Sequence, residues 1–312
     1  MRLSIITINR NNAKGLEKTL QSVLAQTNSD FEYVVVDGAS MDESVEVTKR
    51  FAERFGERMK WISEPDLGIY NAMNKGVEIA LGKRCVKDDH TSYITPNKAI
   101  QSDCESYIQI LNSGDILAAP DVTERMIAAL MHHTSIHNTF IPILYGNMIR
   151  DFGNGKFSRD IAKGNGENAA DKPHEVEWTM YDFIKGTVNH DPTYIHRSLY
   201  EKYGLYDESL RITSDWKWFM NVVVFGGEKL YYVPIDVTIF DTTGVSETNL
   251  VVREKERRTE LERILPSAIL KDYDNYHFPI EQYKRLKKHH LWKLVYFMER
   301  VLFKLEKWHI LR

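Results

Sequence analysis

The chain has 312 residues, of which 43% are hydrophobic and 27% charged, and its formal net charge is −3 at pH 7. These values indicate a globular protein with a substantial core and exclude a disordered chain, a disulfide scaffold and a dedicated nucleic-acid binder. The two cysteines, Cys85 and Cys104, lie outside any CxxC or Cys/His cluster. We therefore expect no zinc site, and a reducing cytoplasmic compartment fits best.

The charge is distributed unevenly. Residues 284–312 contain nine Lys or Arg and two Glu, a net charge of +7, so the preceding residues carry −10. The N-terminus has no signal-peptide pattern, and the chain has no run of about 18 apolar residues, so we expect no membrane span.

The N-terminal segment alternates strand and helix patterns. Residues 3–8 are β-branched and apolar, as in a strand buried on both faces of a parallel sheet, and apolar residues then recur at helical spacing over 13–26. A second buried strand at 33–36 and an amphipathic helix at 42–55 repeat the pattern. Short βαβα connections predict a doubly wound, mostly parallel α/β sheet. Further strands are expected at 59–63, 107–111 and 141–145, and further helices at 69–81 and 120–132.

Two polar segments interrupt these elements. Residues 83–106 are irregular and are expected to form a surface insertion. Residues 151–174 are rich in Gly, Asn, Asp and Lys and are expected to form a mobile loop between the two halves of the chain.

Polar residues follow several of the expected strands. In a doubly wound sheet, ligands bind beyond the carboxyl ends of the strands, which directs attention to Thr7 and Asn9, to Asp37, and to the segment 112–115. The phosphate-binding patterns GxGxxG and GxxxxGK[ST] do not follow the first strand. A bound diphosphate would therefore need a metal ion, and Asp115 is a suitable oxygen ligand for Mg²⁺ or Mn²⁺.

Five blocks of sequence resemble family 2 glycosyltransferases, which are inverting enzymes with the GT-A fold. The blocks, in order, are SIITINRNNAKGLEKTLQSVLAQT, FEYVVVDGASMDES, SEPDLGIYNAMNKGVEIALG, LNSGD and NHDPTYIHRSLYEKYGLYDESLRITSDWKW, followed by TTGVS. Within the family, the chain most resembles bacterial enzymes that build cell-surface polysaccharides. The resemblance implies a glycosyltransferase domain over 1–250, with a nucleotide-binding half at 1–150 and an acceptor half at 175–250, and a helical extension at 251–312.

The resemblance also implies roles for single residues. Thr7 and Asn9 would border the nucleotide base, and Asp37 would bind the base or the ribose. Asp66 would lie at the nucleotide pocket with Asn74 and Lys75 nearby.

The LNSGD block stands where the family carries an acidic DxD or DD motif. Asp115 would bind the divalent cation, Mn²⁺ or Mg²⁺, that bridges the donor diphosphate. Asn112 and Gly114 replace carboxylates here, so the affinity for metal is expected to be weak until the diphosphate completes the coordination shell.

Asp215 matches the catalytic base of the family. In-line displacement with inversion needs one base opposite the leaving group, and burial beside Trp216 or Trp218 is expected to raise its pKa. Those tryptophans either stack on an acceptor sugar or belong to the core. His190 either contacts the diphosphate or acceptor or is structural, and the role of Asp191, where relatives have Gln, stays open. Residues 241–246 resemble a flap over the donor.

The basic C-terminal segment has one apolar helical face and many lysines. This pattern indicates attachment to the surface of a membrane, and the alternatives are packing on the core or on a second subunit in a homodimer.

The sequence thus predicts a metal-dependent, inverting glycosyltransferase. It would move a sugar from a nucleotide-diphosphate donor, expected to be UDP-linked, to a saccharide or lipid-linked saccharide acceptor. The competing hypotheses are a nucleotidyltransferase, which would need a glycine-rich phosphate loop, and a non-catalytic sugar-nucleotide-binding protein.

Overall fold

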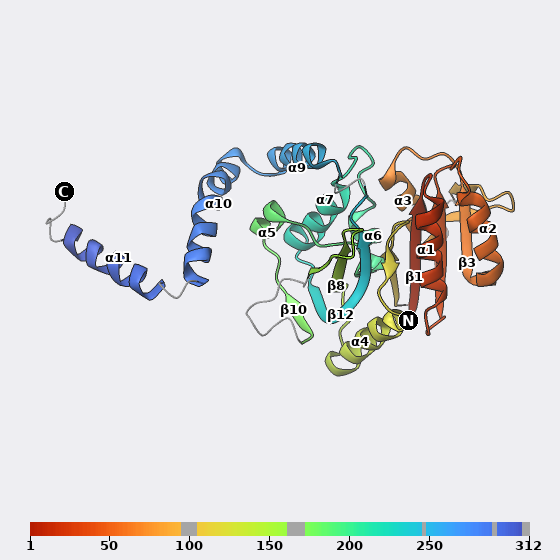
Figure 1. Cartoon of the computed structure of the whole chain (residues 1–312), viewed down its shortest axis with the longest axis horizontal. Coiled ribbons are helices and arrows are strands. Elements are labelled where there is room, and N and C mark those ends of the chain that lie inside the picture. The colour runs from red at the N-terminus through yellow and green to blue at the C-terminus, as the bar shows by residue number, and fades with distance from the viewer. Residues whose placement is uncertain (95–104, 161–171, 245–247, 289–291, 308–312) are drawn as a thin grey trace. The chain divides into compact units, whose positions relative to one another are not determined.

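The computed structural model describes residues 1–94, 105–160, 172–244, 248–288 and 292–307, and within these the chain forms two compact units, 1–256 and 257–312 (Figure 1). The first unit contains a sheet with the strand order β10-β12-β8-β11-β6-β1-β2-β3, to which β7 and β9 add at β12 and β8. The strands are β1 (Arg2–Asn9), β2 (Phe31–Asp37), β3 (Met59–Ser63), β6 (Ser106–Ile110), β7 (Ile116–Leu117), β8 (Ile143–Asp151), β9 (Phe157–Asp160), β10 (His174–Val176), β11 (Thr193–His196) and β12 (Leu230–Asp241).

Helices cover both faces of the N-terminal part of the sheet. Alternate residues of a strand point to opposite faces; Leu3 and Ile5 belong to the core cluster that includes Leu16 of α1, whereas Ile6 approaches Gly76 of α3 on the other face. The helices of this unit are α1 (Ala13–Leu24), α2 (Ser44–Phe55), α3 (Ile69–Ala80), α4 (Val122–His137), α5 (Met180–Lys185), α6 (Arg197–Tyr203) and α7 (Ser214–Met220). The predicted doubly wound α/β fold is confirmed.

The sheet is mixed rather than mostly parallel in its C-terminal part. Strands β1, β2, β3 and β6 pair in parallel, but β11 runs antiparallel to both β6 and β8. Strand β11 has only four residues and pairs with strands that are distant in the sequence, so no local sequence pattern predicted it.

Two of the expected loops contain strands. Strands β4 (Arg84–Val86) and β5 (Ser92–Ile94) form a hairpin within 83–106, so the expectation of an irregular insertion was wrong for these residues. Strand β9 extends the main sheet within 151–174 and corrects the expected loop at 157–160. Residues 95–104 and 161–171 lie outside the described residues.

The second unit is helical. The last residues of α9 (Leu250–Ile264) lead into α10 (Ser267–Lys288) and α11 (Trp292–Lys307), and Pro279 lies inside α10. Among the described helices, none has the length and hydropathy that crossing a membrane requires.

Candidate functional site

An antiparallel strand brings His190 and Asp191 to the ligand-binding edge of the sheet. Ile195 of β11 pairs with Ile108 of β6, and the two strands run in opposite directions. The residues that precede β11 therefore lie beside those that follow β6, which begin at Leu111 and include Asn112. This geometry places a histidine and an aspartate at the edge where parallel strands end.

His190 contacts carboxylates from two segments. Its Nδ1 lies 3.2 Å from Asp215 Oδ2, at the start of α7, and its Nε2 lies 3.2 Å from Asp191 Oδ1. The Asn112 amide also contacts Nε2, at 3.0 Å. Asp215 has 16% of its side chain exposed and His190 15%, compared with 3% for Asp191. Asp215 and His190 thus reach solvent, whereas Asp191 is buried against His190.

The electrostatics of this group favour an ionised Asp215. Burial raises the pKa of Asp215, but the hydrogen bond and charge of His190 and the hydrogen bond of Tyr70 outweigh it, so the pKa lies below its ordinary value. Burial lowers the pKa of His190, and the charges of Asp191 and Asp215 overcome this effect and raise it well above its ordinary value. The expectation that burial beside the tryptophans raises the pKa of Asp215 was therefore wrong, because a cationic neighbour dominates.

Tyr70, in the first turn of α3, holds the second oxygen of Asp215. Its hydroxyl lies 2.9 Å from Asp215 Oδ1 and 2.6 Å from the Ile212 carbonyl oxygen. Burial and the charge of Asp215 raise the pKa of Tyr70, so the phenol stays neutral and serves as a donor. Tyr70 was not among the site residues expected from the sequence, although it lies in the SEPDLGIYNAMNKGVEIALG block, because its contact with Asp215, 145 positions away, depends on the tertiary fold.

The tryptophans beside Asp215 belong to the core. Trp216 and Trp218 are almost fully buried, and their indole N–H groups donate to the carbonyl oxygens of Phe183 and Gly204. Of the two alternatives, core packing is the one that the structure supports.

Asp115 is buried at the base of the site. Its Oδ1 accepts a hydrogen bond from the backbone N–H of Asp241, at 2.8 Å, and its neighbour is Asp191. Burial and the charge of Asp191 raise its pKa well above the ordinary value. Gly114, the preceding residue, has a φ of +110°, and a Cβ there would lie 3.6 Å from Asp241 Oδ2. The carboxylate of Asp241, at the end of β12, thus lies beside Gly114, the position where the acidic family motif would have a carboxylate.

Asp37 and the end of β1 form a second polar cluster. Asp37 is fully buried and accepts from Asn9 Nδ2 (2.8 Å), the backbone N–H and hydroxyl of Ser40 (2.9 and 2.5 Å), and the Ser63 hydroxyl (2.7 Å). Thr7 is also buried, and its hydroxyl bonds to Tyr33 at 2.9 Å. Contacts of these three predicted residues with a nucleotide remain predictions, and in this structure Asn9 and Asp37 hold Ser40, in the loop after β2.

Asp66 lies in the loop after β3 and contacts the loops that follow β1 and β2. Its Oδ1 accepts from Arg10 Nη1 (3.2 Å) and from the Gly68 N–H (3.1 Å). A Cβ at Gly38 would lie 2.0 Å from its other oxygen, Oδ2. Position 38 therefore requires a glycine because Asp66 approaches it closely, and not because its φ is positive. Arg10, largely exposed, adds a cation to this edge.

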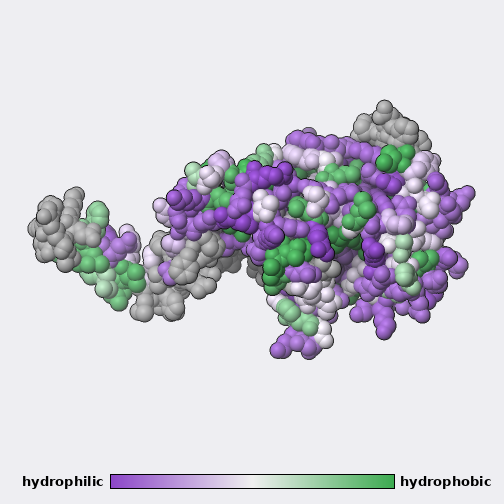
Figure 2. Space-filling model, turned by 90° about the horizontal axis from the view of Figure 1, so that it is seen from above, coloured by the Kyte–Doolittle hydropathy of each residue, from purple (hydrophilic) through white to green (hydrophobic). Residues whose placement is uncertain are grey.

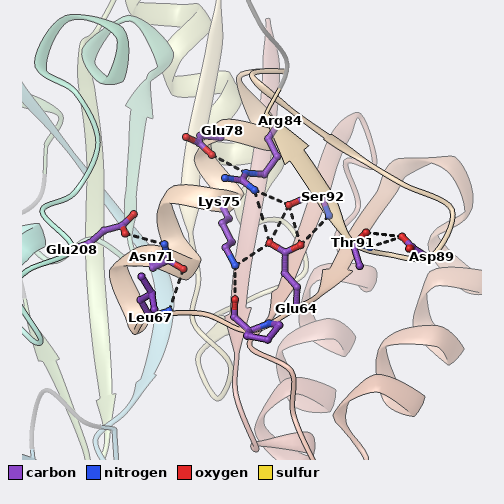
Figure 3. Close-up of polar contacts among 11 residues, drawn as sticks. Glu64, Leu67, Asn71, Lys75, Glu78, Arg84, Asp89, Thr91, Ser92 and Glu208 are labelled. Carbon is purple, nitrogen blue, oxygen red and sulfur yellow. Dashed lines mark hydrogen bonds and ion pairs between the residues drawn. The ribbon is translucent and has the colours of Figure 1, made fainter.

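Lys75 and Asn74 are anchored to protein groups, and Figure 3 shows the contacts of Lys75. Lys75 Nζ lies 2.9 Å from Glu64 Oε1 and donates to the Pro65 carbonyl oxygen at 2.8 Å, so it fixes the segment that carries Asp66. Asn74 donates to the Tyr206 carbonyl and to Glu208, and accepts from the Tyr206 N–H. Their predicted proximity to a nucleotide is untested, and their bonds in this structure support the surrounding loops.

The predicted flap begins at the end of β12. The Asp241 carboxylate accepts from the backbone N–H and hydroxyl of Thr243, and the Thr242 hydroxyl donates to the Asp151 carbonyl oxygen. The described part of this segment, up to Gly244, is tied to the sheet, and residues 245–246 lie outside the described residues.

Comparison with known proteins shows what the chain is similar to. The model of glycosyl transferase family 2 matches residues 4–95. A "PGL/p-HBAD biosynthesis glycosyltransferase" of Mycobacterium bovis is 26% identical over 257 residues, which cover 82% of each chain. An uncharacterised glycosyltransferase of Mycobacterium tuberculosis is 26% identical over 275 residues, 85% of each chain. The chain is a glycosyltransferase, and its N-terminal part matches family 2.

Solved structures support the same fold for this glycosyltransferase. S. aureus TarS 1-349 in complex with UDP superposes with a TM-score of 0.56 at 16% identity, covering 89% of this chain and 72% of that one. The complex of the same protein with UDP-GlcNAc gives a TM-score of 0.57 over 89% and 73% of the two chains. These similarities confirm the GT-A fold.

Proposed function

We propose that this glycosyltransferase moves a sugar from a UDP-linked donor to an acceptor hydroxyl with inversion, and that Asp215 is the base. The observation that carries the proposal is the environment of Asp215. Both of its oxygens are held, by Tyr70 and His190, and yet the side chain is partly exposed at the ligand-binding edge. The Trp216 N–H is a third donor to this carboxylate, which has about four lone-pair sites, so at least one site is left for an incoming hydroxyl.

The proposed reaction is a single displacement. The acceptor oxygen forms a bond to the anomeric carbon as the bond from that carbon to the diphosphate oxygen breaks, and the electron pair of that bond leaves with the diphosphate. The hydroxyl proton passes to Asp215. A base on one face and a leaving group on the other give inversion.

The choice of a uridine nucleotide rests on similarity. TarS, whose fold this chain shares, was solved with UDP and with UDP-GlcNAc. The loops after β1, β2 and β3 meet around Asp37 and Asp66 at the carboxyl ends of parallel strands, where nucleotides bind in doubly wound sheets.

The predicted divalent cation fits Asp115 poorly. The carboxyl group is buried, one oxygen is occupied by the Asp241 N–H, and the neighbouring Asp191 favours a proton rather than an open coordination position. Across the described residues, no group of three or more His, Cys, Asp or Glu side chains is arranged to hold a metal. We therefore derive no chemical step through a cation, and a metal requirement remains a prediction.

The test compares Asp215→Asn with Asp207→Asn, a matched loss of a carboxylate eight residues earlier. Removing a general base lowers turnover by roughly 10²- to 10⁴-fold, so Asp215→Asn should nearly abolish UDP release while leaving UDP affinity unchanged. Asp207→Asn should retain turnover. Wild-type turnover in Asp215→Asn would contradict the assignment.

A panel of nucleotide-sugar donors tests the remaining alternatives. A transferase releases UDP from its cognate donor in the presence of acceptor, whereas a non-catalytic binding protein releases none and a nucleotidyltransferase releases pyrophosphate from a nucleoside triphosphate.

We also propose that α11 attaches the enzyme to an anionic membrane surface, which would bring it to a lipid-linked saccharide acceptor. Eight apolar or aromatic side chains of this helix are 38–66% exposed, and Figure 2 shows hydrophobic side chains gathered along it. The cations Lys293, Arg300 and Lys304 follow one another at spacings of seven and four residues, which places them along one side of the helix. A helix of this kind lies in the interface of a membrane with cations toward the lipid headgroups.

Vesicle flotation of the full chain tests the attachment. Each cation near an anionic surface contributes about 1 kcal/mol, so replacing all three by Gln should weaken binding to phosphatidylglycerol vesicles by roughly 100-fold. A matched triple variant at the exposed residues Lys14, Lys18 and Lys49 should float like wild type. If both triple variants float equally, the attachment is wrong; a dimer that dissociates in the α11 variant would favour a second subunit instead.

A further inference from the structure

Two buried oxygen atoms beside His190 lack hydrogen-bond partners. They are Asn112 Oδ1 and Asp191 Oδ1. Burial of an oxygen without a donor costs free energy, so their clustering around one ring nitrogen needs an explanation. Asp191 Oδ1 lies 3.2 Å from His190 Nε2, and the nitrogen of the Asn112 amide faces the same atom at 3.0 Å.

A doubly protonated His190 accounts for both atoms. In that form Nε2 carries a hydrogen that can be shared between two acceptors. The oxygen and nitrogen of an amide are assigned from the hydrogen-bond network, and turning the Asn112 amide over brings Oδ1 to face Nε2–H. Asp191 Oδ1, 3.2 Å from the same nitrogen, then faces the positive charge of the ring, which offsets the cost of burying it.

The other ring nitrogen faces Asp215. An ionised carboxylate can only accept, so the contact between His190 Nδ1 and Asp215 Oδ2 requires a hydrogen on Nδ1. Tyr70 holds the other oxygen of Asp215 from α3. A continuous chain of hydrogen bonds and an ion pair thus runs from Asp191 through His190 to Asp215 and ends at Tyr70.

We propose that His190 and Asp191 are positioning residues for the base. Asp191 fixes the ring of His190, and His190 fixes the carboxylate of Asp215 so that its free lone pairs face the acceptor. His190 therefore acts through Asp215 and does not bind the donor diphosphate, contrary to one of the two roles expected from the sequence. This inference rests on the proposed role of Asp215 as the base.

The variants His190→Gln and Asp191→Asn separate positioning from donor binding. Loss of a supporting hydrogen-bond partner in an active site lowers activity by roughly 10- to 100-fold. We expect kcat to fall by this factor in His190→Gln, with UDP affinity measured by calorimetry within about twofold of wild type. Asp191→Asn should show a smaller fall of the same kind, because the ring keeps its contact with Asp215.

The pH profile provides a second readout that a structural role would not change. The groups that face Asp215 are His190, Tyr70 from α3 and Tyr206 from the loop before α7, with Asp191 and Asp115 beyond the histidine. His190 is the cation among them, so the acidic limb of kcat/KM should move to higher pH in His190→Gln. Tyr70→Phe removes a neutral donor from the same carboxylate and should move the limb less.

The outcomes distinguish this inference from the proposed function. Wild-type turnover in Asp215→Asn would overturn both. An inactive Asp215→Asn together with an unshifted profile in a folded His190→Gln, or a tenfold loss of UDP affinity in that variant with kcat unchanged, would overturn the positioning role alone. If His190→Gln does not fold, the kcat and UDP affinity of Asp191→Asn decide in the same way.

Discussion

The cluster around Asp37 allows its structural contribution to be measured separately from nucleotide binding. Substituting Ala removes four hydrogen bonds at a fully buried position. The Ser40 and Ser63 hydroxyls can rotate toward other acceptors, whereas the Ser40 N–H cannot, and the Asn9 amide keeps only its longer contact with Ser40 Oγ, at 3.3 Å. Each buried donor without a partner costs about 1–3 kcal/mol, so we expect Asp37→Ala to lower the free energy of unfolding by about 4 kcal/mol.

Thermal unfolding followed by circular dichroism measures this loss. For a unit of this size, 1 kcal/mol corresponds to about 2–4 °C in Tm, so the expected decrease is roughly 8–16 °C. The matched control is Asp42→Ala. Asp42 also accepts from two backbone N–H groups and a hydroxyl, but it is exposed, and water can replace the lost acceptor, so its effect should be much smaller. If Asp37→Ala has the same Tm as wild type and only its UDP affinity falls, Asp37 is a nucleotide ligand and the expected cost of removing its buried hydrogen bonds is wrong.

Three further predictions concern the same unit. A Cβ on Gly76 would lie 2.4 Å from Ile6 Cγ2, so Gly76→Ala should destabilise the protein by about 1–3 kcal/mol in chemical denaturation; an unchanged midpoint would show that α3 shifts freely. If Asp115 is structural, calorimetry should find the same effect of Mn²⁺ on UDP affinity in Asp115→Asn as in wild type, and loss of a Mn²⁺ effect would instead make Asp115 a ligand. Because the pKa of Asp215 is lowered, its contribution to stability should be complete above the unfolded value of about 3.9, decline as the pH falls from there, and be lost once the pH has passed through the lower folded value; acid titration of wild type against Asp215→Asn tests this, and equal pH dependence would contradict it.

The N-terminal half of the fold was predictable because its signals are local. Residues 3–8 lie inside β1 and residues 33–36 inside β2, since a strand buried on both faces needs a continuous apolar run. The predicted helix at 69–81 agrees closely with α3. In contrast, β11 has four residues and depends on pairing with β6 and β8, which no local pattern encodes.

The site was only partly predictable for the same reason. Asp215 and His190 stand in recognisable motifs, but their contact depends on how β11 is placed. Lys75 was expected near the nucleotide pocket, which stays a prediction, and its pairing with Glu64 was not predictable from the motif. The sign of the pKa shift at Asp215 also depends on its neighbours, and burial alone predicted the wrong direction.

The position of Tyr70 has a consequence for engineering donor specificity. Gly68 and Asp66 lie just before α3, and Tyr70 lies in its first turn. The loop proposed to receive the nucleotide is therefore only a few residues away from the hydroxyl of Tyr70, which donates a hydrogen bond to Asp215. A grafted loop from a relative with another donor would move the hydroxyl that orients the base. Exchange of residues 64–71 should therefore be designed together with the start of α7, as a single module.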